Sequence, residues 1–280
     1  MIAAEEANHS VARLCENLEV SRSGYYDWRR RETLDLERSM LIHEVKRLHG
    51  RKRGSLGSRR MAAKLRESGY SVGRHRARSL MREAGVECHQ RRRFRATTLS
   101  DHRRPVAPNL LQRDFSAERP NEAWLADITA VWTLQGWVYL AAVLDVYDRQ
   151  IVGWAMDEHM RSDLATRALE MAIGRRRPPH GLIHHSDRGS QYASVAYQQL
   201  LQRNGLTPSM SRKGDCWDNA PMERFFGTLK TDWTGYQRYR TRQAAYDDIA
   251  RFIELEYNSD HNHSSLGYLT PREQEMAAVA

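Results

Sequence analysis

The sequence predicts an α/β fold in which a mixed β-sheet is flanked by helices and preceded by small all-α units. Three observations predict it. Residues 10–84 space their apolar residues as helices do, residues 122–157 form three consecutive runs rich in aromatic, Val and Ile residues, and the chain from residue 162 alternates helical and strand patterns. With 280 residues, the chain is long enough for one large or two modest domains.

Positive charge is unevenly distributed along the chain. The formal net charge is +9, yet residues 51–104 alone hold 17 basic and 4 acidic residues. An ordinary solvated surface intersperses the two signs. The basic excess therefore points to a polyanionic partner, and we expect the first third of the chain to bind nucleic acid.

Residues 1–34 are predicted to form a helix-turn-helix-like segment. A first helix is predicted over residues 10–18, with Ser10 as its N-cap, and Ser21 can cap a second helix of about ten residues. The second helix carries Arg22 and Arg29, which are candidate DNA contacts. A helical hairpin that only packs on its neighbour explains the same pattern equally well.

Residues 36–95 are predicted to form a second basic unit, also helix-turn-helix-like. Its three predicted helices cover residues 36–49, 58–65 and 72–84. On the third helix Arg74, Arg78 and Arg82 recur at every fourth position, and such a stripe can follow the phosphates of DNA. Residues 91–95 add a basic arm.

Residues 119–235 are predicted to form the sheet domain, after a linker over residues 96–118. The predicted strands cover residues 122–131, 137–145, 150–157, 182–186 and 206–210. The predicted helices cover residues 162–173, residues 193–204 and a long segment from about residue 219. This order fits a ribonuclease-H-like sheet better than a doubly wound fold. Residues 236–280 are then a C-terminal helical extension.

Three acidic residues are candidate catalytic and metal-binding groups. Asp127 lies midway along an apolar strand, where an unpaired acid is costly, Asp187 directly follows another apolar strand, and Glu223 lies early in the last long helix. Three converging carboxylates repel one another, so they imply divalent cations, and two Mg²⁺ ions about 3.5–4 Å apart can support phosphodiester chemistry. Nucleotide-binding, P-loop, serine-hydrolase and zincin motifs do not occur in the sequence.

Two residues near Glu223 are candidate DNA contacts. Trp217 lies in a polar loop just before the long helix. Lys230 follows Glu223 by two helical turns on the same face, about 10 Å along the helix axis. This separation is too long for the two side chains to share a metal, but it suits a phosphate next to the scissile one.

Other polar and aromatic residues are expected to have structural roles. Caps or turns, rather than catalysis, are expected for Asp145, Asp215 and Asp218. Core positions, rather than platforms on which bases stack, are expected for Trp124, Trp137 and Trp154. His184 and His185 are adjacent in a strand, so they point to opposite faces and cannot ligate one metal together. The odd number of cysteines, Cys15, Cys88 and Cys216, without a C-x-x-C pair, argues against a disulfide framework and a zinc finger.

At these positions the sequence resembles the retroviral-integrase superfamily of DDE transposases, specifically the large-frame transposase of the bacterial family called insertion sequence three. The resemblance covers nearly the whole chain. It rests on Pro120-Asn121, Trp124, Asp127-Ile128-Thr129, Gly136-Trp137, Tyr139-Leu140, Arg149, Ile151-Val152-Gly153-Trp154, His185-Ser186-Asp187-Arg188-Gly189, Gln191-Tyr192, Asp218-Asn219-Ala220, Glu223, Lys230, Tyr257-Asn258, His263, Leu266-Gly267-Tyr268 and Thr270-Pro271. The 35 residues between Asp187 and Glu223 match the spacing of this family. Asp148, where the family usually has Ser, and Asp260-His261-Asn262, in place of an often Arg-rich stretch, depart from it.

The resemblance implies a metal-dependent polynucleotidyl transferase. Such an enzyme binds the terminal inverted repeats of its own element, nicks the ends and joins the freed 3′-hydroxyl to target DNA. The implied cofactor is Mg²⁺, as two ions held by Asp127, Asp187 and Glu223, with Mn²⁺ able to substitute. The implied partners are double-stranded DNA at the element ends and the target, further copies of the chain on DNA, and a small upstream-frame helix-turn-helix protein that is fused or associated.

Two other functions fit parts of the pattern. A sequence-specific DNA-binding regulator would use the N-terminal helical units but needs no carboxylate set. A non-specific ribonuclease-H-like nuclease would use the carboxylates but needs no helical units for sequence recognition. The sequence lacks a secretory signal and any apolar run near the ~18 residues that span a bilayer, so we expect a cytoplasmic, nucleoid-associated protein without a membrane partner.

Overall fold

The computed structural model describes residues 1–89, 106–212 and 216–279. The chain divides into two compact units, Met1–Cys88 and His89–Ala280. The predicted basic arm and the first part of the predicted linker lie outside the described residues, and the predicted domain boundaries stay predictions. Within the described ranges, the helices are all too short or too polar to cross a membrane.

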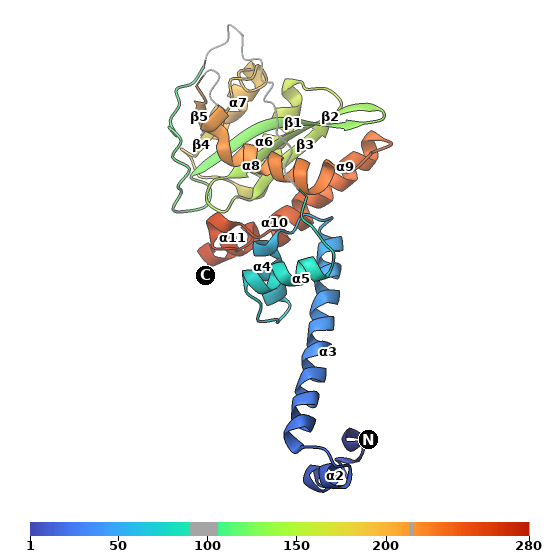
Figure 1. The fold of residues 1–280 in the computed structure, drawn as a ribbon. Helices are drawn as coiled ribbons and strands as arrows, with labels where there is room; N and C mark the ends of the chain where they lie inside the picture. The colour runs from blue at the N-terminus through green and yellow to red at the C-terminus, as the bar shows by residue number, and fades with distance from the viewer. Residues whose placement is uncertain (90–105, 213–215, 280) are drawn as a thin grey trace. The chain divides into compact units, whose positions relative to one another are not determined.

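The first unit is all helical, as expected. Its helices are α1 (Ile2–Glu5), α2 (Val11–Asn17), α3 (Arg22–Arg51), α4 (Ser58–Glu67) and α5 (Arg74–Glu83) (Figure 1). The hydroxyls of Ser10 and Ser21 cap α2 and α3, as predicted, by accepting hydrogen bonds from the backbone N–H groups of Arg13 and Gly24.

The prediction of separate helices before and after residue 35 is wrong. The structure has one helix, α3, of 30 residues. The segment Glu32–Asp35 contains neither Pro nor Gly, so nothing in the backbone ends the helix there. The apolar residues before and after this segment fall on different faces of the helix, and in a sequence such a change favours a break. The helix is continuous because its two ends pack different faces into two separate clusters.

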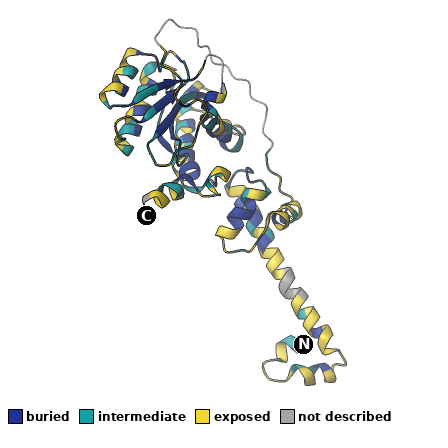
Figure 2. Ribbon diagram, turned by 90° about the vertical axis from the view of Figure 1, so that its left-hand side faces the viewer, coloured by how far each residue is buried: buried dark blue, intermediate teal, exposed yellow. Residues whose placement is uncertain are grey.

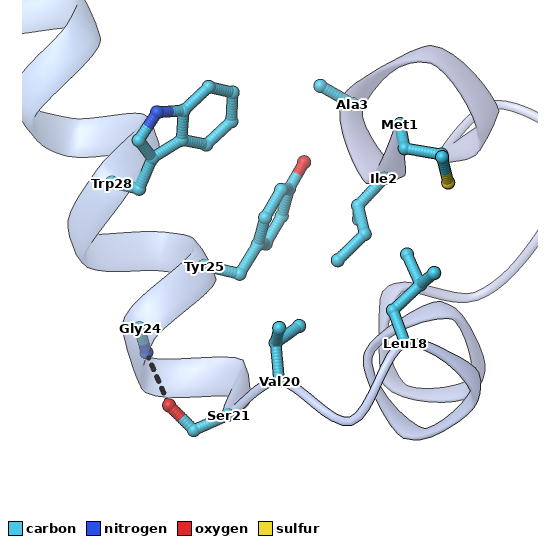
Figure 3. Close-up of a pocket in the computed structure, with 9 residues that line it drawn as sticks. All are labelled: Met1, Ile2, Ala3, Leu18, Val20, Ser21, Gly24, Tyr25 and Trp28. Carbon is cyan, nitrogen blue, oxygen red and sulfur yellow. Dashed lines mark hydrogen bonds between the residues drawn. The ribbon is translucent and has the colours of Figure 1, made fainter.

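Two separate apolar clusters stabilise this unit. Near the N-terminus, Ile2, Cys15 and Tyr25 pack together, and the adjoining side chains leave a cavity of about 550 Å³ that Trp28 and Val20 help to line (Figure 3). The larger cluster joins the second half of α3 to α4 and α5 and contains Leu41, Val45, Leu48, Leu56, Met61, Ala62, Leu65, Val72, Ala77, Leu80, Met81 and Ala84.

The second unit contains a five-stranded mixed sheet. Its strands are β1 (Ala123–Thr133), β2 (Gly136–Asp145), β3 (Ile151–Asp157), β4 (Ile183–Ser186) and β5 (Thr207–Met210), in the spatial order β3-β2-β1-β4-β5. The first three strands are antiparallel, whereas β4 and β5 run parallel to β1. This is the predicted ribonuclease-H-like arrangement, with strand boundaries within two residues of those expected.

Helices cover both faces of the sheet. They are α6 (Ser162–Arg176), α7 (Val195–Arg203), α8 (Ala220–Thr228), α9 (Arg242–Arg251), α10 (Asn258–Asp260) and α11 (Pro271–Val279) (Figure 1). On one face Trp124 and Ala126 of β1 pack with α6 and α7, and on the other Leu125 and Val131 pack with α8 and α9. Alternation along β1 therefore divides the core into two apolar layers.

Buried acidic residues fix the turn between β2 and β3. Asp145 accepts hydrogen bonds from the backbone N–H groups of Asn121 and Tyr147, as expected of a turn residue. Asp148 is fully buried and lies 2.9 Å from Arg176, which also pairs with Glu275 of α11. This ion network connects Asp148, the position where the related family usually has Ser, to the C-terminal helix.

Two of the three predicted core tryptophans differ from expectation. Trp124 is fully buried, as predicted. Trp137 is 47% exposed, because it lies at the start of β2, in the turn that extends past the covering helices. Trp154 is half-buried, and its Nε1–H donates a hydrogen bond to Glu254 at 2.7 Å.

Candidate active site

Parallel pairing of β1 and β4 brings the two candidate aspartates together. Ala126 of β1 is paired in register with Ser186 of β4, so Asp127, midway along β1, and Asp187, directly after the end of β4, each follow a position of the same pair. Asp127 Oδ1 accepts a hydrogen bond from the Ile128 N–H at 2.7 Å, and Asp187 Oδ1 accepts one from the Gly189 N–H at 2.8 Å. Both side chains are half-buried and held by their local backbone.

The helix α8 presents Glu223 in its first turn. Pro221 opens the helix at a position where the missing N–H costs nothing, and Met222 and Phe225 are fully buried against the sheet. Asn219 Nδ2 donates to the carbonyl oxygen of Ala126 at 3.3 Å, which ties the start of α8 to β1 directly beside Asp127. Glu223 itself is exposed.

The pKa of Asp127 is shifted by burial and by the charged groups around it. Burial, followed by the neighbouring charge of Asp187, raises the pKa of Asp127 to about 8, and Glu223 adds to the shift. The Ile128 N–H and the ammonium group of Lys230 oppose it. The charges of Asp187 and Glu223 therefore both act on Asp127, and a bound cation would relieve this repulsion in place of the proton that Asp127 retains.

The donor chemistry of this cluster suits magnesium, although its present spacing is wide. Carboxylate oxygens are the ligands that Mg²⁺ prefers, and two of the three lie on strands that fix their positions. Among the side chains described, no group of three or more His, Cys, Asp and Glu residues is close enough to hold a metal ion. Glu223 is the exposed member of the set, whereas Asp127 and Asp187 are half-buried.

The environment of Lys230 differs from the expected one. The helix does not continue as α-helix but changes into a π-helix over Leu229–Thr234. Lys230 is half-buried, and burial lowers its pKa while the charge of Asp127 opposes this. Lys230 thus lies within electrostatic reach of the carboxylates, and the assumption of two regular helical turns was wrong. Its DNA contact stays a prediction.

The segment before α8 is held by a buried aspartate. Trp217, in the 3-10 helix Cys216–Asn219, is 67% exposed. Asp218 is fully buried and does not cap α8; it accepts hydrogen bonds from Asn109, Arg113 and Arg212 instead. These donors hold the pKa of Asp218 far below its usual range. Asp215 lies outside the described residues.

The adjacent histidines point to opposite faces, as predicted. His184 Nε2 is 3.0 Å from the hydroxyl of Tyr197 on α7, whereas the ring of His185 lies between the hydroxyls of Ser209 and Ser211. Burial lowers the pKa of His184 to about 3 and that of His185 to about 4. Both rings are therefore neutral structural groups at neutral pH.

The candidate arginines of the first unit are mostly exposed and unpaired. Arg74, Arg78 and Arg82 of α5 are exposed, and no carboxylate in the described part of the chain pairs with them. Arg22 is exposed in the same way, whereas Arg29 forms an ion pair with Glu6 at 2.9 Å. Four of the five guanidinium groups are thus available to a polyanion.

Tyr192 belongs to the Gln191-Tyr192 pair of the family resemblance, but the sequence predicts no role of its own for it. It is buried, and its hydroxyl has no hydrogen-bond partner among the described residues. Burial, and then the charge of Asp127, raises its pKa. The Gln191-Tyr192 pair of the resemblance pointed to this position, but a sequence pattern gives no sign of a buried hydroxyl that lacks a partner.

Models of known families match both units. Two integrase core domain models match residues 117–216 and 204–271, and an HTH-like domain model matches residues 35–94. Among solved structures, an intasome of simian T-cell lymphotropic virus in complex with a PP2A regulatory subunit is similar at 16% identity, with a TM-score of 0.46, over 82% of this chain and 74% of that chain.

Full-length relatives agree with these matches. The "Insertion element IS600 uncharacterized 31 kDa protein" of Shigella sonnei is 48% identical over 92% of this chain and 96% of that protein. "Transposase InsF for insertion sequence IS3A" of Escherichia coli (strain K12) is 36% identical over 100% of this chain and 98% of that protein. With an integrase core, an HTH-like domain and full-length similarity of this degree, the chain belongs to the family of the IS3 transposases.

Proposed function

We propose that this transposase binds the terminal inverted repeats of an insertion sequence, cleaves a strand at each end and transfers the freed 3′-hydroxyl to target DNA. The observation that carries the proposal is the position of Asp127, whose pKa is raised by burial and by Asp187 and Glu223 together. A divalent cation would replace the proton that Asp127 otherwise retains, and two such cations can support phosphodiester transfer.

The following roles are part of the proposal. Asp127 and Asp187 act as fixed metal ligands; the neighbouring N–H groups that bond their carboxylates, beside the point where β4 ends against β1, support this assignment. Glu223 completes the ligand set from α8. When bound, two Mg²⁺ ions, or Mn²⁺ in their place, would activate the attacking oxygen of water or of a 3′-hydroxyl and stabilise the leaving oxygen. Lys230 and Trp217 contact the DNA next to the scissile phosphate.

The first unit recognises the ends of the element. We assign Arg22, Arg29, Arg74, Arg78 and Arg82 to phosphate contacts, with Arg29 contributing least because Glu6 already neutralises it. Further copies of the chain assemble on the two ends, with a small upstream-frame helix-turn-helix protein fused or associated. The proposed place of action is the cytoplasm, at the nucleoid.

Alanine substitution of the triad tests the proposal. Asp127→Ala, Asp187→Ala and Glu223→Ala should each reduce strand cleavage and joining at least ~10³-fold, because each removes a ligand worth several kcal/mol of barrier. Binding of the element ends should persist, and Asp163→Ala, an exposed acid on α6, is the matched control. A triad variant that keeps more than about a tenth of the activity in Mg²⁺ does not belong to the metal site.

A further inference from the structure

The turn between β1 and β2 exposes a pair of aromatic rings. Trp132 and Trp137 face each other in the register of the two strands, with ring centroids 4.9 Å apart in an edge-to-face arrangement. They are 56% and 47% exposed. Cross-strand packing fixes the rings in place, yet both remain open to solvent. Large aromatic side chains that are fixed and exposed mark an interaction surface.

A second segment of the chain is bonded to the same turn. The Leu134 N–H donates to the carbonyl oxygen of Tyr239 at 3.0 Å, and the Arg242 N–H donates to Gln135 Oε1 at 3.0 Å. Figure 1 shows this turn extending beyond the body of the sheet, near the start of α9. The segment that leads into α9 is therefore part of the surface around the tryptophan pair.

This second segment is basic. Tyr239 is buried in extended backbone, so its neighbours Arg238 and Arg240 both point away from the core, and both are exposed. In the described part of the chain no carboxylate pairs with either of them, whereas Arg242 forms an ion pair with Glu158 at 2.5 Å. The surface thus combines two aromatic rings with two available positive charges.

The composition of this surface favours a nucleic-acid strand over a protein. Residues 129–139 carry no charge, and residues 236–242 carry three arginines and no acid. Unpaired bases stack on exposed aromatic rings, and nearby guanidinium groups neutralise their phosphates. A second protein chain would instead use apolar area, of which Leu134, 72% exposed at the turn, offers the most.

We propose that Trp132, Trp137, Arg238 and Arg240 form a binding surface for a DNA strand whose bases are unpaired. β1 carries both this surface and the candidate metal ligand: Trp132 is five residues, or about 17 Å along the strand, from Asp127. Because five is an odd offset, the two side chains point to opposite faces of the sheet, so a strand opened near a cleavage or joining site would reach this surface by passing around the β1–β2 hairpin. The assignment of this surface to strands opened during cleavage or joining rests on the proposed function. The binding of an unpaired strand to the surface does not.

Binding of a labelled 12-nucleotide oligo(dT) to the full chain, followed by anisotropy without Mg²⁺, tests the surface. Trp132→Ala and Trp137→Ala should each weaken binding about ten-fold, and the matching Phe variants should keep most of the affinity. Leu134→Ala is the matched control, because it removes exposed apolar area without removing a ring, and should change affinity by less than about two-fold.

Salt dependence and cross-linking complete the test. The double variant Arg238→Ser, Arg240→Ser should lower the slope of log affinity against log salt by about 1.4. Arg242→Ser, which removes an arginine already paired with Glu158, should lower it less. An oligonucleotide that carries 5-iododeoxyuridine should form photo-cross-links to Trp132 or Trp137 even if the first unit also binds the strand.

Three outcomes would overturn the proposal: unchanged affinity in both tryptophan variants with cross-links elsewhere, a loss in Leu134→Ala equal to that in the tryptophan variants, or loss of self-association alone. The last two would assign the surface to a protein interface. Failure of the wild type to cleave DNA while it binds oligo(dT) through these rings would count against the proposed function only. Cleavage without such binding would count against this surface only.

Discussion

The two units of this transposase differ in where their charged side chains lie. The first unit leaves Arg22, Arg74, Arg78 and Arg82 in solvent, and Figure 2 shows much of its long helix α3 exposed. The second unit fully buries Asp145, Asp148 and Asp218 and surrounds them with donors. Exposed charges suit reversible, salt-sensitive binding, whereas buried charges lose solvation and must be held in fixed geometry. The comparison predicts that charge removal in the first unit changes affinity and in the second changes stability.

Removing the most heavily bonded buried charge should give the largest effect. Asp218→Ala leaves Asn109, Arg113 and Arg212 without their shared acceptor and should lower the free energy of unfolding of the second unit by about 3 kcal/mol. Chemical denaturation followed by tryptophan fluorescence measures it. Asp163→Ala, which removes an exposed acid 3.8 Å from Arg167, should cost less than about 0.5 kcal/mol. Equal losses in the two variants would contradict the comparison.

Removing exposed charge should change DNA affinity instead. The triple variant Arg74→Ser, Arg78→Ser, Arg82→Ser should lower the salt slope of duplex binding by about 2.7, because three phosphate contacts are lost. Its thermal unfolding should stay close to that of the wild type. Arg76→Ser is the matched control on the same helix, since Arg76 already pairs with Glu37 at 3.3 Å, and it should change the slope less. A slope unaffected by the triple variant would place the DNA on another face.

The departure at Asp148 should make stability depend on pH. Burial, and then the neighbouring Asp145, raises the pKa of Asp148 to about 7, although Arg176 opposes this. Between about pH 4 and pH 7 the folded chain therefore holds a proton that the unfolded chain has released, so stability falls as pH rises through this window. Asp148→Ser, which installs the residue common in the family, should flatten the fall by on the order of 2 kcal/mol. Thermal unfolding at several pH values measures it, and a parallel decline in the variant would exclude Asp148 as its source.

The smallest expected effect distinguishes two buried phenols. The hydroxyl of Tyr197 bonds to His184 at 3.0 Å, whereas that of Tyr192 has no partner among the described residues. Tyr197→Phe should therefore lose about 1 kcal/mol of stability, and Tyr192→Phe should lose none or gain slightly. Calorimetry without Mg²⁺ compares them. A loss of equal size in Tyr192→Phe would mean that its hydroxyl is bonded in solution.

The strands and most helices could be predicted because the spacing of apolar residues in the sequence matches the side chains that are buried in the structure. The alternation of β1 and the apolar run of β2 follow directly from core packing, and the predicted boundaries lie within two residues of those observed. The three carboxylates could also be singled out from the sequence, since Asp127 lies in an apolar strand, Asp187 directly follows another and Glu223 lies in the first turn of a helix. Their roles stay proposals.

The features that could not be predicted arise from tertiary contacts. The continuity of α3 depends on packing at both of its ends, and the π-helix at Leu229 leaves no mark in a 3.6-residue pattern. Trp137 has the composition of a core residue, yet it is 47% exposed and packs edge-to-face on Trp132 across the hairpin. The ion network of Asp148 joins residues more than a hundred positions apart, as its link through Arg176 to Glu275 shows.

The different supports of the three carboxylates have a consequence for dynamics. Asp127 and Asp187 are held by adjacent hydrogen-bonded strands, which open only with the whole sheet, whereas Glu223 belongs to a short helix that changes into a π-helix at Leu229. Local opening of α8 would release Glu223 and leave the aspartate pair intact. Amide protons of β1 and β4 should thus exchange far more slowly than those of α8, and the site would assemble in two steps, with the helix as the later and reversible one.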